Sequence, residues 1–207
     1  LVGTLHSMLA PICIGLSRER LKVAFVMTDG AALPIAFSRT VDNLKKNHLL
    51  TGTVTVGHAF GGDLEAVNIY SGLLAAKKVF AADVIIVTMG PGIVGTGTKW
   101  GFTGIEQGDI LNAVDVLGGV PVAVPRVSFA DPRKRHYGLS HHTLTVLTRV
   151  CRVKTIVPLP LLDESKSNHI FGQLQNNSLP ENISIVIEDS SAIIALLRDS
   201  GIPVSTM

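Results

Sequence analysis

The chain has 207 residues, of which 46% are hydrophobic and 16% are charged, and its formal net charge is +2. This length and apolar content are typical of a folded α/β domain, and they exclude an intrinsically disordered or collagen-like chain. Cys13 and Cys151 are too few for a disulfide scaffold, so we expect two buried thiols in a reducing compartment, the cytoplasm.

Apolar, β-rich runs alternate with segments of helical periodicity along almost the whole chain. The predicted strands cover residues 2–5, 22–27, 53–56, 84–89, 121–127, 155–158 and 184–187. The predicted helices cover residues 8–17, 34–47, 64–80, 105–117, 142–150, 163–173 and 191–199. Continuously apolar strands indicate a parallel sheet with helices on both faces. We therefore predict a doubly wound, mostly parallel, Rossmann-like open sheet of about seven strands.

The predicted domain organisation is one α/β domain over residues 1–207, with a weak boundary near 158–160. The first residue is Leu rather than Met, so we expect a fragment that lacks an N-terminal segment. The longest early uncharged stretch, residues 1–17, is shorter than the ~20 apolar residues of a transmembrane helix. No membrane contact is therefore expected.

The segments that leave the predicted strands are rich in polar and glycine residues, whereas the segments that lead into the strands show no comparable cluster of such residues. In an open parallel sheet, the segments that leave strands gather at the carboxyl edge, where ligands bind. This asymmetry predicts a ligand site at that edge. The segments concerned are residues 6–7, 28–30, 57–63, 90–104 and 128–142.

The strongest ligand-binding signal is a glycine-rich segment after the strand predicted at 84–89, with seven glycines between Gly90 and Gly108. Glycine lets backbone N–H groups approach an anion, and the following helix start adds a favourable dipole. The segment is neither a Walker A loop nor a dinucleotide-binding fingerprint. We expect a phosphate or carboxylate site, with a mobile lid and a structural turn as alternatives. Its predicted ligand-binding residues are Gly90, Gly92, Gly95, Thr96, Gly97, Thr98 and Lys99.

Acid–base candidates follow two other predicted strands. His58 is expected at the end of the third strand, as a general acid, general base or metal ligand. Asp63 follows two glycines, where it either caps the helix predicted from residue 64 or serves as a catalytic carboxylate. Asp29 precedes a glycine, so an ordinary turn and a catalytic carboxylate are both consistent with its position.

Basic residues concentrate in residues 126–154, which hold seven Lys or Arg and one acidic residue, Asp131. This excess indicates an anionic ligand at one place, with a solvated loop and helix face as the alternative. The arginine fork suits phosphate, so Arg126, Arg133 and Arg135 are predicted to bind it. Few aromatic residues accompany these charges, which argues against nucleic acid as a partner.

Two adjacent histidines lie at the start of the helix predicted from residue 142, and Ser140 is placed to cap it. His141 is a predicted catalytic residue. Neighbouring helical side chains point about 100° apart, so only one of His141 and His142 is expected to face a given ligand. A metal held by one of them with a residue such as His58 is a minor alternative without a known ligand spacing, so metal and cofactor stay undetermined.

Four segments resemble, as a set, a bacterial family described only as a domain of unknown function, DUF family 3866. They read TDGAALPIAFS, GHAFGGDLEAVNIYSGLLAA, MGPGIVGTGTKWGFTGIEQG and RVSFADPRKRHYGLSHHT. The resemblance covers nearly the whole chain and is weakest after Pro160. It implies a cytoplasmic bacterial protein with additional sequence before the first strand, and it brings no activity, cofactor or catalytic residue with it.

Three functions are open on the sequence. The first is a transferase or hydrolase that binds a small anionic metabolite, such as a phosphorylated sugar or a nucleotide, at the carboxyl edge of the sheet. The second is a non-catalytic binding or regulatory module with the same pocket. The third is a structural subunit whose apolar helices pair in a homodimer.

Overall fold

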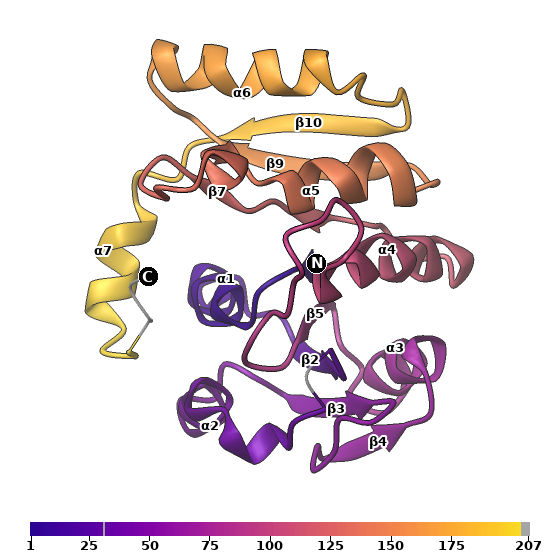
Figure 1. Cartoon of the computed structure of the whole chain (residues 1–207). Helices are drawn as coiled ribbons and strands as arrows, with labels where there is room; N and C mark the ends of the chain where they lie inside the picture. Colours follow the sequence, from indigo (N-terminus) through magenta and orange to yellow (C-terminus); the bar gives the residue numbers. More distant parts are fainter. Residues whose placement is uncertain (31, 204–207) are drawn as a thin grey trace. The chain divides into compact units, whose positions relative to one another are not determined.

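A computed structural model describes residues 1–30 and 32–203, and the chain divides into two compact units. Unit 1 comprises Leu1, Gly3–Val94 and the C-terminal segment from Ser191, and unit 2 comprises Val2 and Gly95–Ser190. Both units combine parallel strands with helices (Figure 1).

A six-stranded sheet has the strand order β4-β3-β2-β5-β1-β6, and β2 pairs with both β3 and β5 in parallel. Every residue of β2 is buried, as expected for a strand with helices on both faces. The predicted doubly wound α/β fold is confirmed, although this sheet has six strands, because the last two predicted strands pair with each other elsewhere and β4, which was not predicted, joins at one edge. Its strands are β1 (Val2–Gly3), β2 (Val23–Thr28), β3 (Gly52–Val56), β4 (Leu64–Ala66), β5 (Val84–Met89) and β6 (Ala123–Val124).

The helices of unit 1 cover the two faces of its strands. Figure 1 shows α1 and α2 on one face and α3 on the other. Helix α7 packs beside α1, and Ile202 after it joins the core that contains Phe25 and Leu44. These helices are α1 (Leu9–Leu16), α2 (Arg39–Lys46), α3 (Ile69–Lys78) and α7 (Ile193–Asp199).

The helix predicted over residues 64–80 begins later than expected. Leu64–Ala66 forms strand β4 beside β3, and α3 starts after Asn68, whose side chain accepts the Ser71 N–H in a capping box. The Asn68 N–H donates in return to Ser71 Oγ at 3.2 Å. Asn68 therefore provides the cap, and the prediction that Asp63 caps this helix is wrong.

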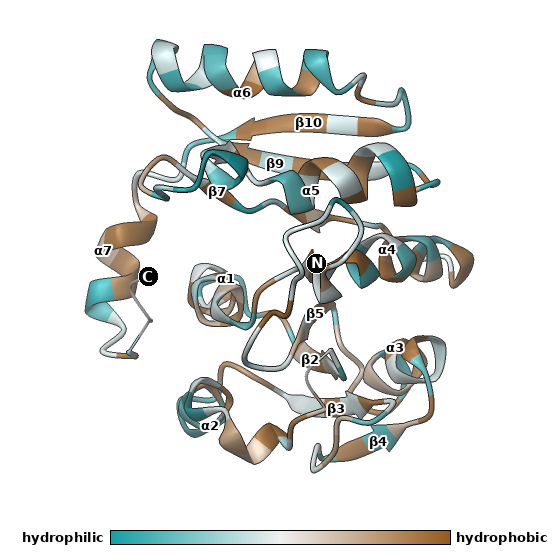
Figure 2. Cartoon of the chain, viewed as in Figure 1, coloured by the Kyte–Doolittle hydropathy of each residue, from teal (hydrophilic) through white to brown (hydrophobic). Residues whose placement is uncertain are grey.

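Unit 2 contains a parallel strand pair, β9 and β10, and a short antiparallel pair, β7 and β8. Its core packs residues of β9, α5 and α6, including Leu144, Leu159 and Ile170. In Figure 2, β9 and β10 are mostly hydrophobic and α6 is mostly hydrophilic, because only one side of α6 is buried. Its elements are α4 (Glu106–Val116), β7 (Val127–Ser128), β8 (Gly138–Leu139), α5 (His141–Thr145), β9 (Thr155–Pro160), α6 (Glu164–Asn176) and β10 (Ile183–Glu188).

Two predicted elements of unit 2 are interrupted. The strand predicted over 121–127 is divided into β6 and β7, because Pro125 lies between them and has no N–H to donate. The helix predicted over 142–150 continues from α5 as a π-helical segment, Val146–Val150. Single π-helical turns are frequent near functional sites.

Both cysteines are free and buried, as predicted. Burial raises the pKa of the Cys13 thiol to about 12, so this thiol is inert at neutral pH. Over residues 1–30 and 32–203, no helix combines the length and apolar character that crossing a bilayer requires.

Candidate functional site

Asp29 and His58, two predicted acid–base residues, meet in unit 1 through a backbone contact. Asp29 Oδ2 accepts a hydrogen bond from the His58 N–H at 3.0 Å. Gly57 has a φ of +67°, and a Cβ on it would lie 2.7 Å from the same oxygen. Asp29 therefore closes a turn after β3 that requires glycine, while the His58 side chain is exposed.

The second predicted carboxylate of unit 1, Asp63, is held by structural partners. Its Oδ2 accepts hydrogen bonds from the N–H and hydroxyl of Thr53, both at 2.9 Å, and its Oδ1 pairs with Lys45 Nζ at 2.6 Å. Burial raises the pKa of Asp63, but the hydrogen bonds from Lys45 and Thr53 outweigh it and lower the pKa overall. Asp63 thus ties α2 and β3 to the segment that precedes β4.

A histidine–serine pair that the sequence did not predict lies in unit 1. His6 Nδ1 is 3.2 Å from the Met89 carbonyl oxygen, and His6 Nε2 is 2.6 Å from Ser38 Oγ. Because a carbonyl only accepts, Nδ1 carries the proton and Nε2 accepts from the serine hydroxyl. Ser38 Oγ also accepts the Val41 N–H at the start of α2, and Ser38 is only 2% exposed. This hydrogen-bonded pair therefore anchors the start of α2, and Ser38 is not a nucleophile open to substrate.

The predicted ligand-binding glycines are divided between the two units. Gly90 and Gly92 belong to unit 1, where Gly90 is buried, while Gly95 begins the part that belongs to unit 2. Lys99 in unit 2 is exposed, and its Nζ lies 5.9 Å from the centre of the Trp100 ring.

Residues 95–101 form a small closed turn, here called the glycine-rich turn. The Thr96 N–H donates to the Gly101 carbonyl oxygen at 2.7 Å. Thr96 Oγ1 and Thr98 Oγ1 lie 2.9 Å apart, and the Thr98 hydroxyl accepts the Gly101 N–H. Both threonine hydroxyls therefore brace the turn, and Gly97 lies exposed at its tip.

Asp131 organises the predicted anion-binding arginines. Arg133 donates Nε and Nη2 to its two carboxylate oxygens at 2.9 and 2.8 Å, and Arg126 Nη2 donates to Oδ2 at 3.2 Å. The Arg133 hydrogen bonds hold the pKa of Asp131 well below its usual range. Arg126 and Arg133 thus share one carboxylate, which leaves one net positive charge among the three groups.

Arg135 is the remaining arginine, and it lies against the glycine-rich turn. Its Nη1 is 3.3 Å from the point that a Cβ on Gly97 would occupy, and its Nε donates to His136 Nε2 at 3.3 Å. In the described part of the chain, no carboxylate lies within ion-pairing distance of Arg135. Its charge is therefore not neutralised by an acidic side chain there.

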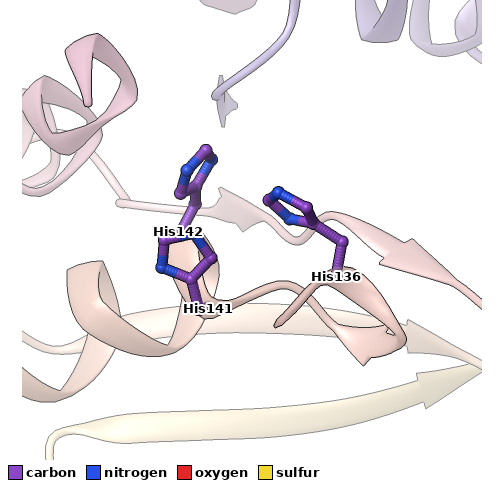
Figure 3. Close-up of side chains that lie close together, drawn as sticks. All are labelled: His136, His141 and His142. Atoms are coloured by element: carbon purple, nitrogen blue, oxygen red, sulfur yellow. The ribbon is translucent and has the colours of Figure 1, made fainter. Parts of the chain in front are cut away.

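His136, His141 and His142 form one group in unit 2, here called the histidine cluster. Each offers one ring nitrogen, and these three nitrogens lie within 4.8 Å of one another. Figure 3 shows His141 and His142 together at the start of α5 and His136 facing them from the preceding turn. The ring centroids of His141 and His142 are 4.3 Å apart, and that of His136 is 5.0 Å from that of His142.

Ser140 and Phe102 hold the histidine cluster in place. Ser140 Oγ caps α5 by accepting the His142 N–H, as predicted, and it also lies 2.7 Å from His136 Nδ1. The Phe102 ring stacks on His142, with ring centroids 4.0 Å apart and planes 7° from parallel. Two of the three imidazoles therefore have defined positions.

The surroundings of the cluster keep its imidazoles neutral. Burial, followed by the charges of neighbouring histidines and arginines, lowers the pKa of His142 to about 3 and that of His136 to about 4. Burial, then Arg135 and Arg126, also lower the pKa of His141. The same positive potential that disfavours an imidazolium ion favours an anion.

The sequence predicts that His141 and His142 point about 100° apart, but their ring centroids lie 4.3 Å apart and one ring nitrogen of each lies within 4.8 Å of one on His136. Both side chains emerge in the first turn of α5, where no preceding helical turn restricts their rotamers. His136 was not predicted as a site residue. The signal that points to it is density, since three of the seven histidines of the chain fall within residues 136–142.

A model of the family described as "Protein of unknown function (DUF3866)" matches residues 1–207, which confirms the resemblance carried by the four segments. None of the curated proteins matches the chain. The features of the chain that bear on its function are therefore the glycine-rich turn, the arginines and the histidine cluster.

Proposed function

Because the chain belongs to the family of proteins of unknown function (DUF3866), we propose a function from its own site. Unit 2 binds a small phosphorylated metabolite, such as a sugar phosphate or a nucleotide, where Arg135 meets the glycine-rich turn. Arg126 and Arg133 supplement the positive potential, and Lys99 supplies a further cation at the exposed turn.

The observation that carries the proposal is the placement of Arg135. Its Nη1 lies 3.3 Å from the position that a Cβ on Gly97 would take, which is a tight contact, and its guanidinium group has no carboxylate partner in the described residues. A guanidinium fork binds a phosphate with two parallel hydrogen bonds, and glycine leaves room for the anion beside the backbone. A phosphate at this place would compensate a charge that the protein leaves unpaired.

The arginine pair around Asp131 adds to this potential. Asp131 fixes Arg126 and Arg133 through hydrogen bonds, so both guanidinium groups are preorganised before any ligand arrives. The three arginines and one carboxylate have a net charge of +2, counted from Arg126, Arg133, Arg135 and Asp131. This excess supports an anion of two negative charges, which is the charge of a phosphate monoester near neutral pH.

We propose ligand binding, as in a binding or regulatory module of the cytoplasm, rather than acid–base catalysis by the predicted carboxylates. Asp29 and Asp63 belong to unit 1, and their carboxylate oxygens accept structural hydrogen bonds. His58 also belongs to unit 1. The proposed anion site needs none of these three residues.

Calorimetric titration of the full chain with inorganic phosphate, in metal-free buffer, tests the proposal. Arg135→Gln removes one charge and should weaken phosphate binding by about tenfold or more, because a charged hydrogen bond contributes roughly 1.5–3 kcal/mol. Gly97→Val should weaken binding too, because Gly97 has a φ of +81° and a Cβ there approaches Arg135.

Lys154→Gln is the matched control, since it removes an exposed positive charge from unit 2 outside the arginine group. It should leave phosphate binding within about twofold of the unmodified chain. Equal binding by the Arg135→Gln and Lys154→Gln variants, or no binding by the unmodified chain at millimolar phosphate, would refute the anion site.

A further inference from the structure

The histidine cluster contains ring nitrogens without a hydrogen-bond partner. Within the described part of the chain, His141 Nε2 and His142 Nδ1 are both buried and unpartnered, and His142 is only 7% exposed. Leaving one buried polar atom unsatisfied costs roughly 1–3 kcal/mol. Two such atoms on adjacent residues indicate that something occupies the space they face.

The hydrogen bonds of His136 define where its lone pair lies. Arg135 is only a donor, so its contact with His136 Nε2 requires that this nitrogen be unprotonated. In the neutral ring the proton then resides on Nδ1, which donates to Ser140 Oγ at 2.7 Å. A metal-binding histidine typically donates its second N–H in this way, which fixes the tautomer and the ring orientation.

The remaining requirements for a metal ligand are also met. A ligating imidazole must be neutral, and burial with the nearby positive charges lowers the pKa values of all three rings. The acidic residue nearest in sequence, Asp131, is engaged by Arg126 and Arg133 and offers no free oxygen for a hard cation. A donor set of imidazole nitrogens suits Zn²⁺, Co²⁺, Ni²⁺ or Cu²⁺ rather than Mg²⁺ or Ca²⁺.

We propose that His136, His141 and His142 form a binding site for a divalent transition metal of the zinc type. Ring nitrogens within 4.8 Å need to close to about 3.3 Å around a tetrahedral ion, so metal binding draws the three rings closer together. Three protein ligands leave the fourth position open to a water molecule or to an oxygen of an anion.

The metal site goes beyond the proposed anion site and does not depend on it, because it is argued from the unpartnered nitrogens. The two sites share one contact. Arg135 donates to the nitrogen of His136 that the metal needs, so a phosphate that draws Arg135 toward Gly97 frees this lone pair. The arginine charges oppose a bare dication, and a bound anion offsets them. Phosphate should therefore strengthen metal binding.

The primary test is titration of the full chain with Zn²⁺ in phosphate-free buffer, with calorimetry as the measurement of binding. A parallel titration with Co²⁺ uses visible absorption, which reports coordination geometry. One ion should bind per chain, and the Co²⁺ spectrum should be that of a four-coordinate site with three nitrogen ligands and one oxygen ligand. His141→Ala and His142→Phe should each weaken Zn²⁺ binding by more than the roughly 10–100-fold that loss of an outer-shell partner causes.

His169→Ala is the matched control, because His169 is an exposed histidine of unit 2 outside the cluster. It should bind Zn²⁺ like the unmodified chain. Thermal unfolding of each variant without metal establishes that it folds. If His142→Phe does not fold, the Zn²⁺ affinity of His141→Ala decides the result.

Equal Zn²⁺ affinity in His141→Ala and His169→Ala, or a stoichiometry of zero in the unmodified chain, would overturn the metal site. Because the metal titration contains no phosphate and the phosphate titration contains no metal, either proposal can fail without the other. If both hold, phosphate should raise the Zn²⁺ affinity of the unmodified chain but not that of Arg135→Gln.

Discussion

The histidines that pack inside the two units differ in how their ring nitrogens are satisfied. In unit 1, both nitrogens of His6 have protein partners, Ser38 Oγ and the Met89 carbonyl. In unit 2, His141 and His142 each retain one buried nitrogen without a partner in the described residues. Burial is the first cause of a lowered pKa in both units. Unused hydrogen-bonding capacity, rather than burial or pKa, therefore distinguishes a candidate site from a structural histidine.

The largest expected effect is acid destabilisation that originates in the histidine cluster. In the folded chain the pKa values of His136 and His142 lie at about 4 and about 3, below the 6.5 of a free histidine. Between these values the unfolded chain binds more protons, so the free energy of unfolding falls as the pH falls below 6.5. Each of the two histidines should steepen this fall by at most about 1.4 kcal/mol per pH unit, and neither contributes to the pH dependence well above pH 6.5, where its ring is neutral in both states.

Urea denaturation at pH 7, 6 and 5 measures this slope. His142→Phe keeps a ring stacked against Phe102 but cannot titrate, so it should make the fall in the free energy of unfolding smaller, by about 0.7 kcal/mol between pH 7 and 6 and about 1.2 kcal/mol between pH 6 and 5. An unchanged slope in His142→Phe would show that the cluster is already protonated or that acid unfolding starts elsewhere.

In unit 1, Ser38→Ala should have the next largest effect. It removes the cap that accepts the Val41 N–H, and it leaves Nε2 of the half-buried His6 without its partner. A lost cap costs about 1 kcal/mol and an unsatisfied nitrogen in a half-buried side chain about 1 kcal/mol more, so the free energy of unfolding should fall by about 2 kcal/mol. Chemical denaturation measures it, with Ser165→Ala on the exposed side of α6 as the control. A loss of stability no larger than that of the control would contradict the role of Ser38 in anchoring α2.

The contrast between the units also explains which features the sequence could predict. Strand β5 was predicted at its observed bounds, Val84–Met89, because a continuous apolar run between polar residues has few alternatives. Strand β4 was missed because three residues, Leu64–Ala66, are too few to show alternation, and their pairing with β3 is a tertiary contact. The hydrogen bond between His6 and Ser38 joins residues 32 positions apart, which no local pattern encodes.

The histidine cluster was only half predicted for a related reason. His141 was singled out as a site residue, but His136 reaches it through the reversal that pairs β7 with β8. Ser140 was correctly predicted as a cap because N-cap preferences are local. Its second contact, with His136 Nδ1, depends on how the loop folds back. Sequence patterns therefore identified the loop, and tertiary structure determined which of its side chains converge.

A smaller effect is expected at the aromatic support of the cluster. Phe102 is 5% exposed and its ring stacks on His142. Phe102→Leu keeps an apolar side chain but removes the stacked ring, so it should lower the free energy of unfolding by about 1–2 kcal/mol. Phe37→Leu in unit 1 is the control, since Phe37 is 68% exposed and should change stability by less than about 0.5 kcal/mol. If Phe102→Leu matches this control, the stack does not support the cluster.

The smallest effect is expected for His58→Ala, which extends the contrast to an exposed histidine. Asp29 bonds to the backbone N–H of His58, and this contact survives when the side chain is truncated. The free energy of unfolding should therefore change by less than about 0.5 kcal/mol. Chemical denaturation at pH 7 measures it. A loss above about 1 kcal/mol would mean that the His58 ring has a partner that matters to the fold, and exposure would then not separate it from His6.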